Sequence, residues 1–161
     1  MYTHRDISYR PGELKDVPSL AYFLTNITRE NELIGLLEHD MVIGSVVIRD
    51  LIKQNQGVTI IAEKNDKIVG CMILGKSTVW WSPTEFFTNL AFYVDTEYRK
   101  GFRIQDKLVE AAKNLADATK TPLLLSLVDA TDKKLKALKY LNFKGFKTIG
   151  VKGVYVPPTK E

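Results

Sequence analysis

The stretch AFYVDTEYRKGFRIQDKLVEAAKNLA, residues 91–116, decides the fold, because it joins a strand to a helix through a basic turn that contains glycine. Its start belongs to an aromatic run, Phe86 to Val94, that predicts a strand. Its end predicts a helix over Ile104 to Ala118, where apolar residues recur at helical spacing. Asp95 to Gly101 is the polar turn between them. The first amides of a helix lack internal partners and carry partial positive charge, so this turn is a candidate anion site.

Strand-like and helix-like stretches alternate through the rest of the chain as well. The other expected strands are Ile7 to Arg10, Val58 to Glu63, Lys67 to Leu74, the buried run Leu123 to Val128, and a closing strand or hairpin over Thr148 to Val156. The other expected helices are Glu13 to Thr25, a piece over Leu33 to Leu37, Met41 to Ile52, and one from an Asp132 N-cap to about Asn142. Lys64 to Asp66 forms a hairpin turn, and Gly75 to Thr84 forms a loop. A hairpin followed by βαβ units predicts an α+β fold, with a mixed, mostly antiparallel sheet flanked by helices.

Composition limits the class of protein. The chain has 161 residues, 45% apolar and 26% charged, which fits one domain over residues 1–161. The single cysteine, Cys71, excludes an internal disulfide and reads as a small buried core residue. No apolar stretch approaches the roughly 20 residues of a membrane helix, and residues 1–10 lack the apolar segment of a secretory signal. We therefore expect a cytoplasmic protein without a membrane partner.

Charge is distributed unevenly along the chain. Residues 1–98 carry 9 Lys and Arg against 13 Asp and Glu, whereas residues 99–161 carry 14 against 6. The excess of positive charge in the second part favours an anionic partner there. A nucleotide phosphate, a nucleic acid and a merely solvated lysine-rich surface all agree with this pattern.

Residues 91–116, followed by TPLLLSLV (121–128) and KKLKALKYLNFKGF (133–146), resemble the GNAT superfamily of N-acetyltransferases. The resemblance covers residues 86–147 and extends loosely to ISYRPGELKDVPSLAYFL, residues 7–24. It implies a GNAT-like sheet whose fourth and fifth strands, at Phe86 and at Leu123, splay apart. It also implies that acetyl-CoA is the cofactor, with its pantetheine arm in that opening.

The resemblance further implies which residues bind the cofactor, along the end of the fourth strand and the following turn. These residues are Phe92, Tyr93, Val94, Arg99, Lys100, Gly101, Phe102, Arg103, Ile104 and Gln105, together with Lys134. A backbone amide between Phe92 and Val94 would polarise the thioester carbonyl.

The turn departs from the family pattern R/Q-x-x-G-x-G/A. In one register Phe102 and Ile104 take the places of the small residues, and in the other Arg103 and Gln105 take them. Either the loop opens wider and side chains bind phosphate, or cofactor binding is weak or lost.

The family's acid is a tyrosine four residues before a Gly-Phe pair, a place that Leu141 occupies here. Tyr140 lies one position earlier, which rotates it by about 100° on a helix. Tyr140 is therefore the candidate acid if the helix shifts, and otherwise a structural tyrosine. A thiolate of pKa near 8.5 can leave without a proton donor.

A base is the greater need, because an amine of pKa about 10.4 is almost fully protonated at pH 7, at a cost of about 4.6 kcal/mol. Glu85, at the start of the fourth strand, is the best-placed carboxylate, with Asp95 and Asp129 in reserve. Alternatively, Glu85 is a solvated loop residue. Trp80 and Trp81 are candidates for a substrate platform, or for a pair that packs under a loop or at a subunit contact.

These residues predict an acetyl-CoA-dependent N-acetyltransferase that acts on a primary amine by direct attack. The amine belongs to a small molecule, a protein or a nucleic acid. One alternative is a GNAT-like enzyme acting on nucleic acid or modified bases, and another is a catalytically inactive binding module. His4 and His39 have no triad partner, so hydrolases and metalloenzymes are set aside. The oligomeric state stays open, with a homodimer among the options.

Overall fold

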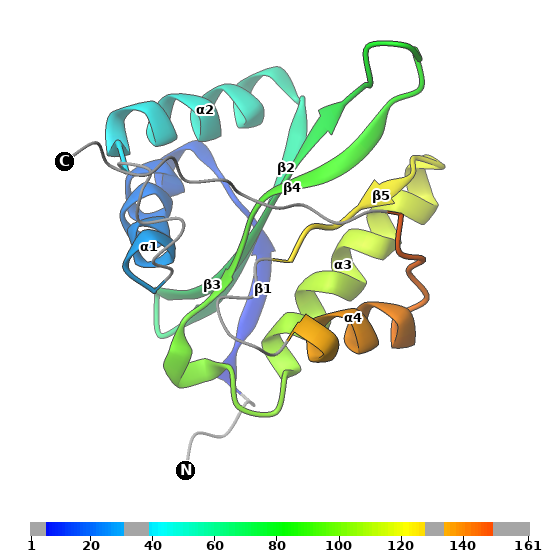
Figure 1. The fold of residues 1–161 in the computed structure, drawn as a ribbon. Coiled ribbons are helices and arrows are strands. Elements are labelled where there is room, and N and C mark those ends of the chain that lie inside the picture. Colours follow the sequence, from blue (N-terminus) through cyan, green and yellow to red (C-terminus); the bar gives the residue numbers. More distant parts are fainter. Residues whose placement is uncertain (1–5, 31–38, 128–133, 150–161) are drawn as a thin grey trace, which may run out of the picture.

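The computed structural model describes residues 6–30, 39–127 and 134–149. They form a five-stranded sheet of order β1-β2-β3-β4-β5 with helices around it (Figure 1). The strands are β1 (Ser8–Pro11), β2 (Gly57–Lys64), β3 (Lys67–Ser77), β4 (Phe86–Val94) and β5 (Leu123–Leu124). The helices are α1 (Val17–Glu30), α2 (Met41–Gln54), α3 (Arg103–Thr119) and α4 (Lys134–Phe143), with 3-10 turns at Leu14–Asp16 and Thr96–Tyr98. All neighbouring strands are antiparallel except β4 and β5, which are parallel. The expected mixed sheet flanked by helices is confirmed.

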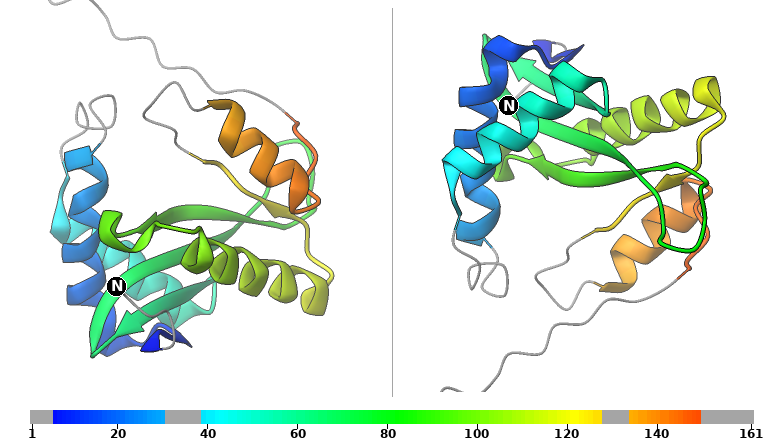
Figure 2. Two further views of the ribbon diagram at one scale, coloured as in Figure 1. Left: turned by 90° about the horizontal axis from the view of Figure 1, so that it is seen from below. Right: turned by 90° about the horizontal axis from the view of Figure 1, so that it is seen from above.

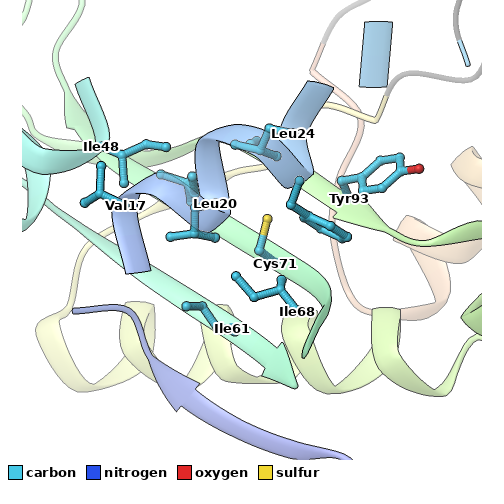
Figure 3. Close-up of a cluster of buried hydrophobic side chains, with 11 residues drawn as sticks. Val17, Leu20, Leu24, Ile48, Ile61, Ile68, Cys71 and Tyr93 are labelled. Atoms are coloured by element: carbon cyan, nitrogen blue, oxygen red, sulfur yellow. The ribbon is translucent and has the colours of Figure 1, made fainter. Parts of the chain in front are cut away.

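Helices cover both faces of the sheet, so the central strands are buried on both sides. On one face α1 and α2 pack over Ile61 and Cys71 (Figure 3), and on the other α3 packs over Ala62 and Met72. α4 lies at the β5 edge beside α3 (Figure 2). This double burial explains why β2 and β3 read as continuous apolar runs rather than alternating ones.

Local sequence accounts for the ends of these elements. The hairpin between β2 and β3 turns through Asn65 and Asp66, at φ of 49° and 61°, the left-handed pair that a two-residue hairpin turn requires. Asp40 caps α2 by accepting hydrogen bonds from the amides of Val42 (2.8 Å) and Ile43 (3.1 Å). The helix expected over Met41 to Ile52 is thereby confirmed.

Some expected boundaries were wrong. The helix expected to end at Thr25 continues to Glu30, and β3 continues to Ser77 into the expected loop. Of the expected buried strand over residues 123–128, the structure describes residues 123–127, and only Leu123–Leu124, both half-buried, form a strand, because pairing with β4 covers only these two residues. Thr148 and Ile149 form no strand. The expected helical piece at 33–37, the Asp132 cap and the rest of the closing strand lie outside the described residues.

Candidate active site

An opening lies between the free ends of β4 and β5. The two strands pair only at Phe87 with Leu123 and at Thr88 with Leu124. At the next position the side-chain amide of Asn89 takes over from the backbone: it accepts from Ser126 N (2.7 Å) and donates to Ser126 O (2.9 Å). Beyond this contact the chain after β5 moves away from β4 (Figure 2). The expected splay between the fourth and fifth strands is therefore present.

Backbone groups at the end of β4 face this opening. The backbone amide of Asp95 donates to Val69 O of β3 (2.9 Å), so the N–H group of Asp95 points toward β3. Because alternate residues of a strand point to opposite neighbours, the N–H groups of Phe92 and Val94 point toward β5. The strand order leaves no pairing strand at that position among the described residues. Two amide donors are therefore available side by side.

The N-terminus of α3 supplies further donors next to this strand end. Gly101 (φ 79°) and Phe102 (φ 56°) lead into the helix, and Phe102, at the N-cap position, makes no side-chain capping bond. The amides of Arg103, Ile104 and Gln105 therefore lack both a helical partner and a side-chain cap. A side chain at Gly101 would meet nothing within 4 Å, so the turn is open there.

Side chains at the turn divide into exposed and buried groups. Lys100, Phe102 and Arg103 are exposed, whereas Ile104 is fully buried in the core. The Oε1 atom of Gln105 is buried and makes no hydrogen bond. Such an unpartnered acceptor is uncommon in proteins.

The side chain of Arg99 contacts the end of β4 and α1. Its Nε donates to Val94 O (2.7 Å) and its Nη2 to Glu30 Oε2 (2.7 Å), while its guanidinium lies over the Tyr93 ring at 5.0 Å. The Tyr93 hydroxyl also donates to Glu30. Burial is the larger cause that raises the pKa of Tyr93, and the hydrogen bond to Glu30 is the next. The expected phosphate ligand Arg99 is therefore held in a contact cluster by Glu30, Tyr93 and Val94.

Tyr140 likewise has a partner, on α3. Its hydroxyl donates to Asp106 Oδ1 (2.7 Å), and its ring stacks on Phe102 with centroids 6.2 Å apart. Burial, and then the hydrogen bond to the Asp106 carboxylate, raises the pKa of Tyr140. Lys144 approaches the same carboxylate (3.3 Å). These contacts join α4 to the first turn of α3.

Glu85, Trp80 and Trp81 lie at the other end of β4. Glu85 is exposed and precedes Val94 by nine residues, roughly 30 Å of extended strand. Trp80 and Trp81 precede it in the loop before β4 and are 95% and 71% exposed. Neither tryptophan packs under that loop. The fold thus gathers the residues of the turn with the end of β4 and leaves these three apart.

Asp95 is the described reserve carboxylate at the open end of β4. It directly follows Val94 and lines a groove of about 660 Å³ beside α1, together with Asp16, Glu63 and Asp66. Asp129 and the Lys134 side chain lie outside the described part. Among the described residues, no cluster of His, Cys, Asp or Glu could hold a metal ion, and no helix is long and apolar enough to cross a membrane.

Sequence reasoning missed two residues of this region, Glu30 and Asn89. Glu30 fell beyond the expected end of the first helix, so nothing indicated that it reaches β4. Asn89 is a polar residue inside an aromatic strand. That interruption is the one signal that could have marked the point where β4 loses its neighbour.

Comparisons with known proteins agree with this arrangement. No protein-family model matches the sequence, and neither does any curated protein. Among solved structures, a possible acetyltransferase from Clostridium difficile 630 is 20% identical, with a TM-score of 0.68 over 96% of this chain and 99% of that one. A predicted acetyltransferase from Clostridium acetobutylicum, solved with acetyl-CoA, is 16% identical, with a TM-score of 0.66 over 94% and 96%.

An aminoglycoside acetyltransferase from an uncultured soil metagenomic sample, in complex with sisomicin, is also similar. It is 16% identical, with a TM-score of 0.67 over 95% of this chain and 97% of that one. These likenesses establish that the chain has the fold of the GNAT acetyltransferases, as the sequence resemblance implied.

Proposed function

We propose that this protein is an acetyl-CoA-dependent N-acetyltransferase that moves an acetyl group to a primary amine by direct attack. One observation carries the proposal: beyond Asn89, β4 has no strand paired on its β5 side within the described residues, and the turn after Val94 leads into the uncapped N-terminus of α3. An extended thioester carrier with phosphates at one end suits both features, since unpaired strand amides bind amide-bearing chains and helix N-termini bind phosphate. Similar structures solved with acetyl-CoA and with an amine acceptor support it.

The described residues fit this cofactor. The pyrophosphate would bind the amides of Arg103, Ile104 and Gln105, with the exposed side chains of Lys100 and Arg103 adding charge. Acetyl-CoA would supply the activated acetyl thioester.

Backbone groups of β4 would then orient the reaction. The amides of Phe92 and Val94 would donate to the pantetheine arm and to the thioester carbonyl, where negative charge develops as the amine attacks. The side chain of Tyr93, a residue expected to bind the cofactor, would instead have a structural role, because it packs against α1 and Glu30. Arg99 would hold the Val94 carbonyl and so keep the strand end in place.

The amine must lose a proton, and Asp95 is better placed than Glu85 to accept it. Direct transfer needs hydrogen-bond reach, and Asp95 directly follows Val94 whereas Glu85 is about 30 Å away along β4. A D95N variant should lose far more activity than E85Q, and the reverse result would restore Glu85 as the base.

Tyr140 would protonate the leaving thiolate only if its hydroxyl left Asp106. The raised pKa of Tyr140 makes its hydroxyl a weak proton donor. A thiolate can leave without a proton donor. We therefore propose that Tyr140 mainly joins α3 to α4.

Calorimetry with acetyl-CoA tests cofactor binding, and R103A should weaken it. Turnover is then measured as free thiol released from acetyl-CoA in the presence of aminoglycoside, polyamine and peptide amines. Cys71 adds no background, because it is fully buried and burial raises its pKa to about 12. Absence of binding at millimolar acetyl-CoA would refute the proposal. Binding without turnover on any amine would favour the non-catalytic binding module.

A further inference from the structure

The chain's two tryptophans stand on one exposed β-turn that the proposed acetyl transfer does not use. The amide of Ser82 donates to Val79 O (3.1 Å), which makes Trp80 and Trp81 the central residues of that turn. They are 95% and 71% exposed. Large aromatic side chains held outward in this way mark a contact surface rather than a core.

A backbone hydrogen bond connects this loop to a groove. Phe87, just after the loop, donates its amide to Pro122 O (2.8 Å). Pro122 and Lys120 line an open groove of about 350 Å³, whose far side is formed by Gly145 and Phe146, after α4. The loop and the end of α4 lie on the same side of the molecule (Figure 2).

The α4 side of this groove is basic and carries a third exposed aromatic ring. Lys139 and Phe143 are four residues apart on α4, so they share one face, and Phe143 is 85% exposed. Lys147 follows, also exposed. Residues 134–149 contain no Asp or Glu. Exposed cations and rings therefore alternate along this side.

Not every lysine here is available to a partner. Lys113 and Lys144 pair with Glu110 at 3.8 and 3.3 Å, and Asp117 also lines the groove. Lys120, Lys139 and Lys147, by contrast, make no ion pair within the described part of the chain. We call the following residues the aromatic–lysine strip: Trp80, Trp81, Lys120, Lys139, Phe143 and Lys147.

We propose that the aromatic–lysine strip binds single-stranded nucleic acid. Base stacking on exposed rings and phosphate contact with unpaired lysines are the two interactions that such binding needs. The strip spreads its rings over two separate elements, which suits an extended strand of successive bases. A bilayer would instead favour one protruding apolar tip, and a protein groove would favour apolar neighbours around the tryptophans. The residues that flank the tryptophans here include one large apolar side chain, Val79, and are otherwise Thr78, Ser82, Pro83 and Thr84.

Intrinsic fluorescence gives a direct test, because both tryptophans of the chain lie in this loop. Titration with oligothymidine of about 15 nucleotides, within the usual range of site sizes, should quench that emission. Three phosphate contacts give a salt slope of about −2 for single strands, so affinity should fall about 20-fold between 50 and 200 mM salt. The W81A variant should weaken binding at least about fivefold, measured by anisotropy of the labelled oligonucleotide.

Matched variants and ligands make the result decisive. K139E should weaken binding, whereas K53E on α2 and Y22A on α1, both at exposed positions, should not. No quenching at about 100 μM oligonucleotide, the weak end of non-specific binding, would overturn the proposal. Quenching by phosphatidylserine vesicles but not by oligonucleotide would overturn it in favour of a membrane surface. Calorimetry with acetyl-CoA should be unchanged in W81A and K139E, which separates this proposal from the proposed function.

Discussion

Replacing Arg99 by alanine separates the structural role of this residue from the phosphate contact that the sequence predicted. R99A removes the bond from Nε to Val94 O (2.7 Å), the pair with Glu30 (2.7 Å) and the contact with the Tyr93 ring (5.0 Å). The hydrogen bond contributes about 1 kcal/mol and the ring contact about 0.5 kcal/mol. The ion pair adds at most about 0.5 kcal/mol, because its side chains are 40% and 32% exposed. The expected loss is about 2 kcal/mol.

Urea unfolding followed by circular dichroism measures this loss, and the melting temperature should fall by about 6 °C for a chain of this size. K100A is the matched control, because Lys100 is an exposed cation of the same turn, and it should change stability by less than about 0.5 kcal/mol. R99K should be intermediate, because lysine keeps the charge but loses the planar fork.

Acetyl-CoA affinity completes the comparison. R103A should reduce it without unfolding the protein, whereas R99A should reduce it only as far as β4 loosens. If R99A unfolded at the wild-type urea concentration yet lost tenfold or more in acetyl-CoA affinity, Arg99 would be a phosphate ligand. The contacts of Arg99 with Glu30, Tyr93 and Val94 would then not account for the effect of R99A.

Three further outcomes follow from single contacts. Y140F removes the bond to Asp106 and should cost about 1 kcal/mol in urea unfolding while leaving turnover within a few-fold; loss of turnover at unchanged stability would show that Tyr140 is the acid. N89A removes the bridge between the separating strands and should cost about 1 kcal/mol and weaken acetyl-CoA binding, and unchanged binding would contradict its role at the opening. The hydrogen bond from Arg10 lowers the pKa of Asp16 below its ordinary 3.8, so stability present above pH 3.8 is lost as pH falls through the lower native value; D16N should flatten that acid limb of a melting-temperature profile, and an unchanged limb would assign it to other carboxylates.

The elements were predictable from the sequence wherever one physical signal dominated. The aromatic run at Phe86 and the helical spacing after Ile104 placed β4 and α3 to within one residue, because both elements bury a continuous apolar surface. The hairpin at Asn65 followed from turn chemistry. Errors arose where an element depends on its neighbour. The run at Leu123 reads as a buried strand, but its length is set by how far β4 stays beside it.

The site was less predictable, because side-chain direction is decided by distant partners. Arg99 takes the place that the resemblance gives to a phosphate ligand, yet its guanidinium pairs with Glu30, 69 positions earlier. Glu85 directly precedes β4 and Val94 ends it, so a base at Glu85 would lie about 30 Å along the strand from a carbonyl bound at Val94. Among the interpretations of the tryptophan pair, packing under its loop was reasonable for apolar residues, but the exposure of both side chains excludes it.

The two departures from the family pattern are one contact in the structure. Phe102, which takes the place of a small residue in one of the two registers of the resemblance, has a left-handed conformation, which costs about 1–2 kcal/mol for a side chain with Cβ. Its ring stacks on Tyr140, and an aromatic pair returns about 0.5–1.5 kcal/mol. Tyr140 reaches both that ring and Asp106 from one position before the family's tyrosine. A bulky residue in the turn and a displaced tyrosine on α4 therefore offset each other. Their joint presence argues for a rebuilt junction between α3 and α4 rather than for two separate losses of function.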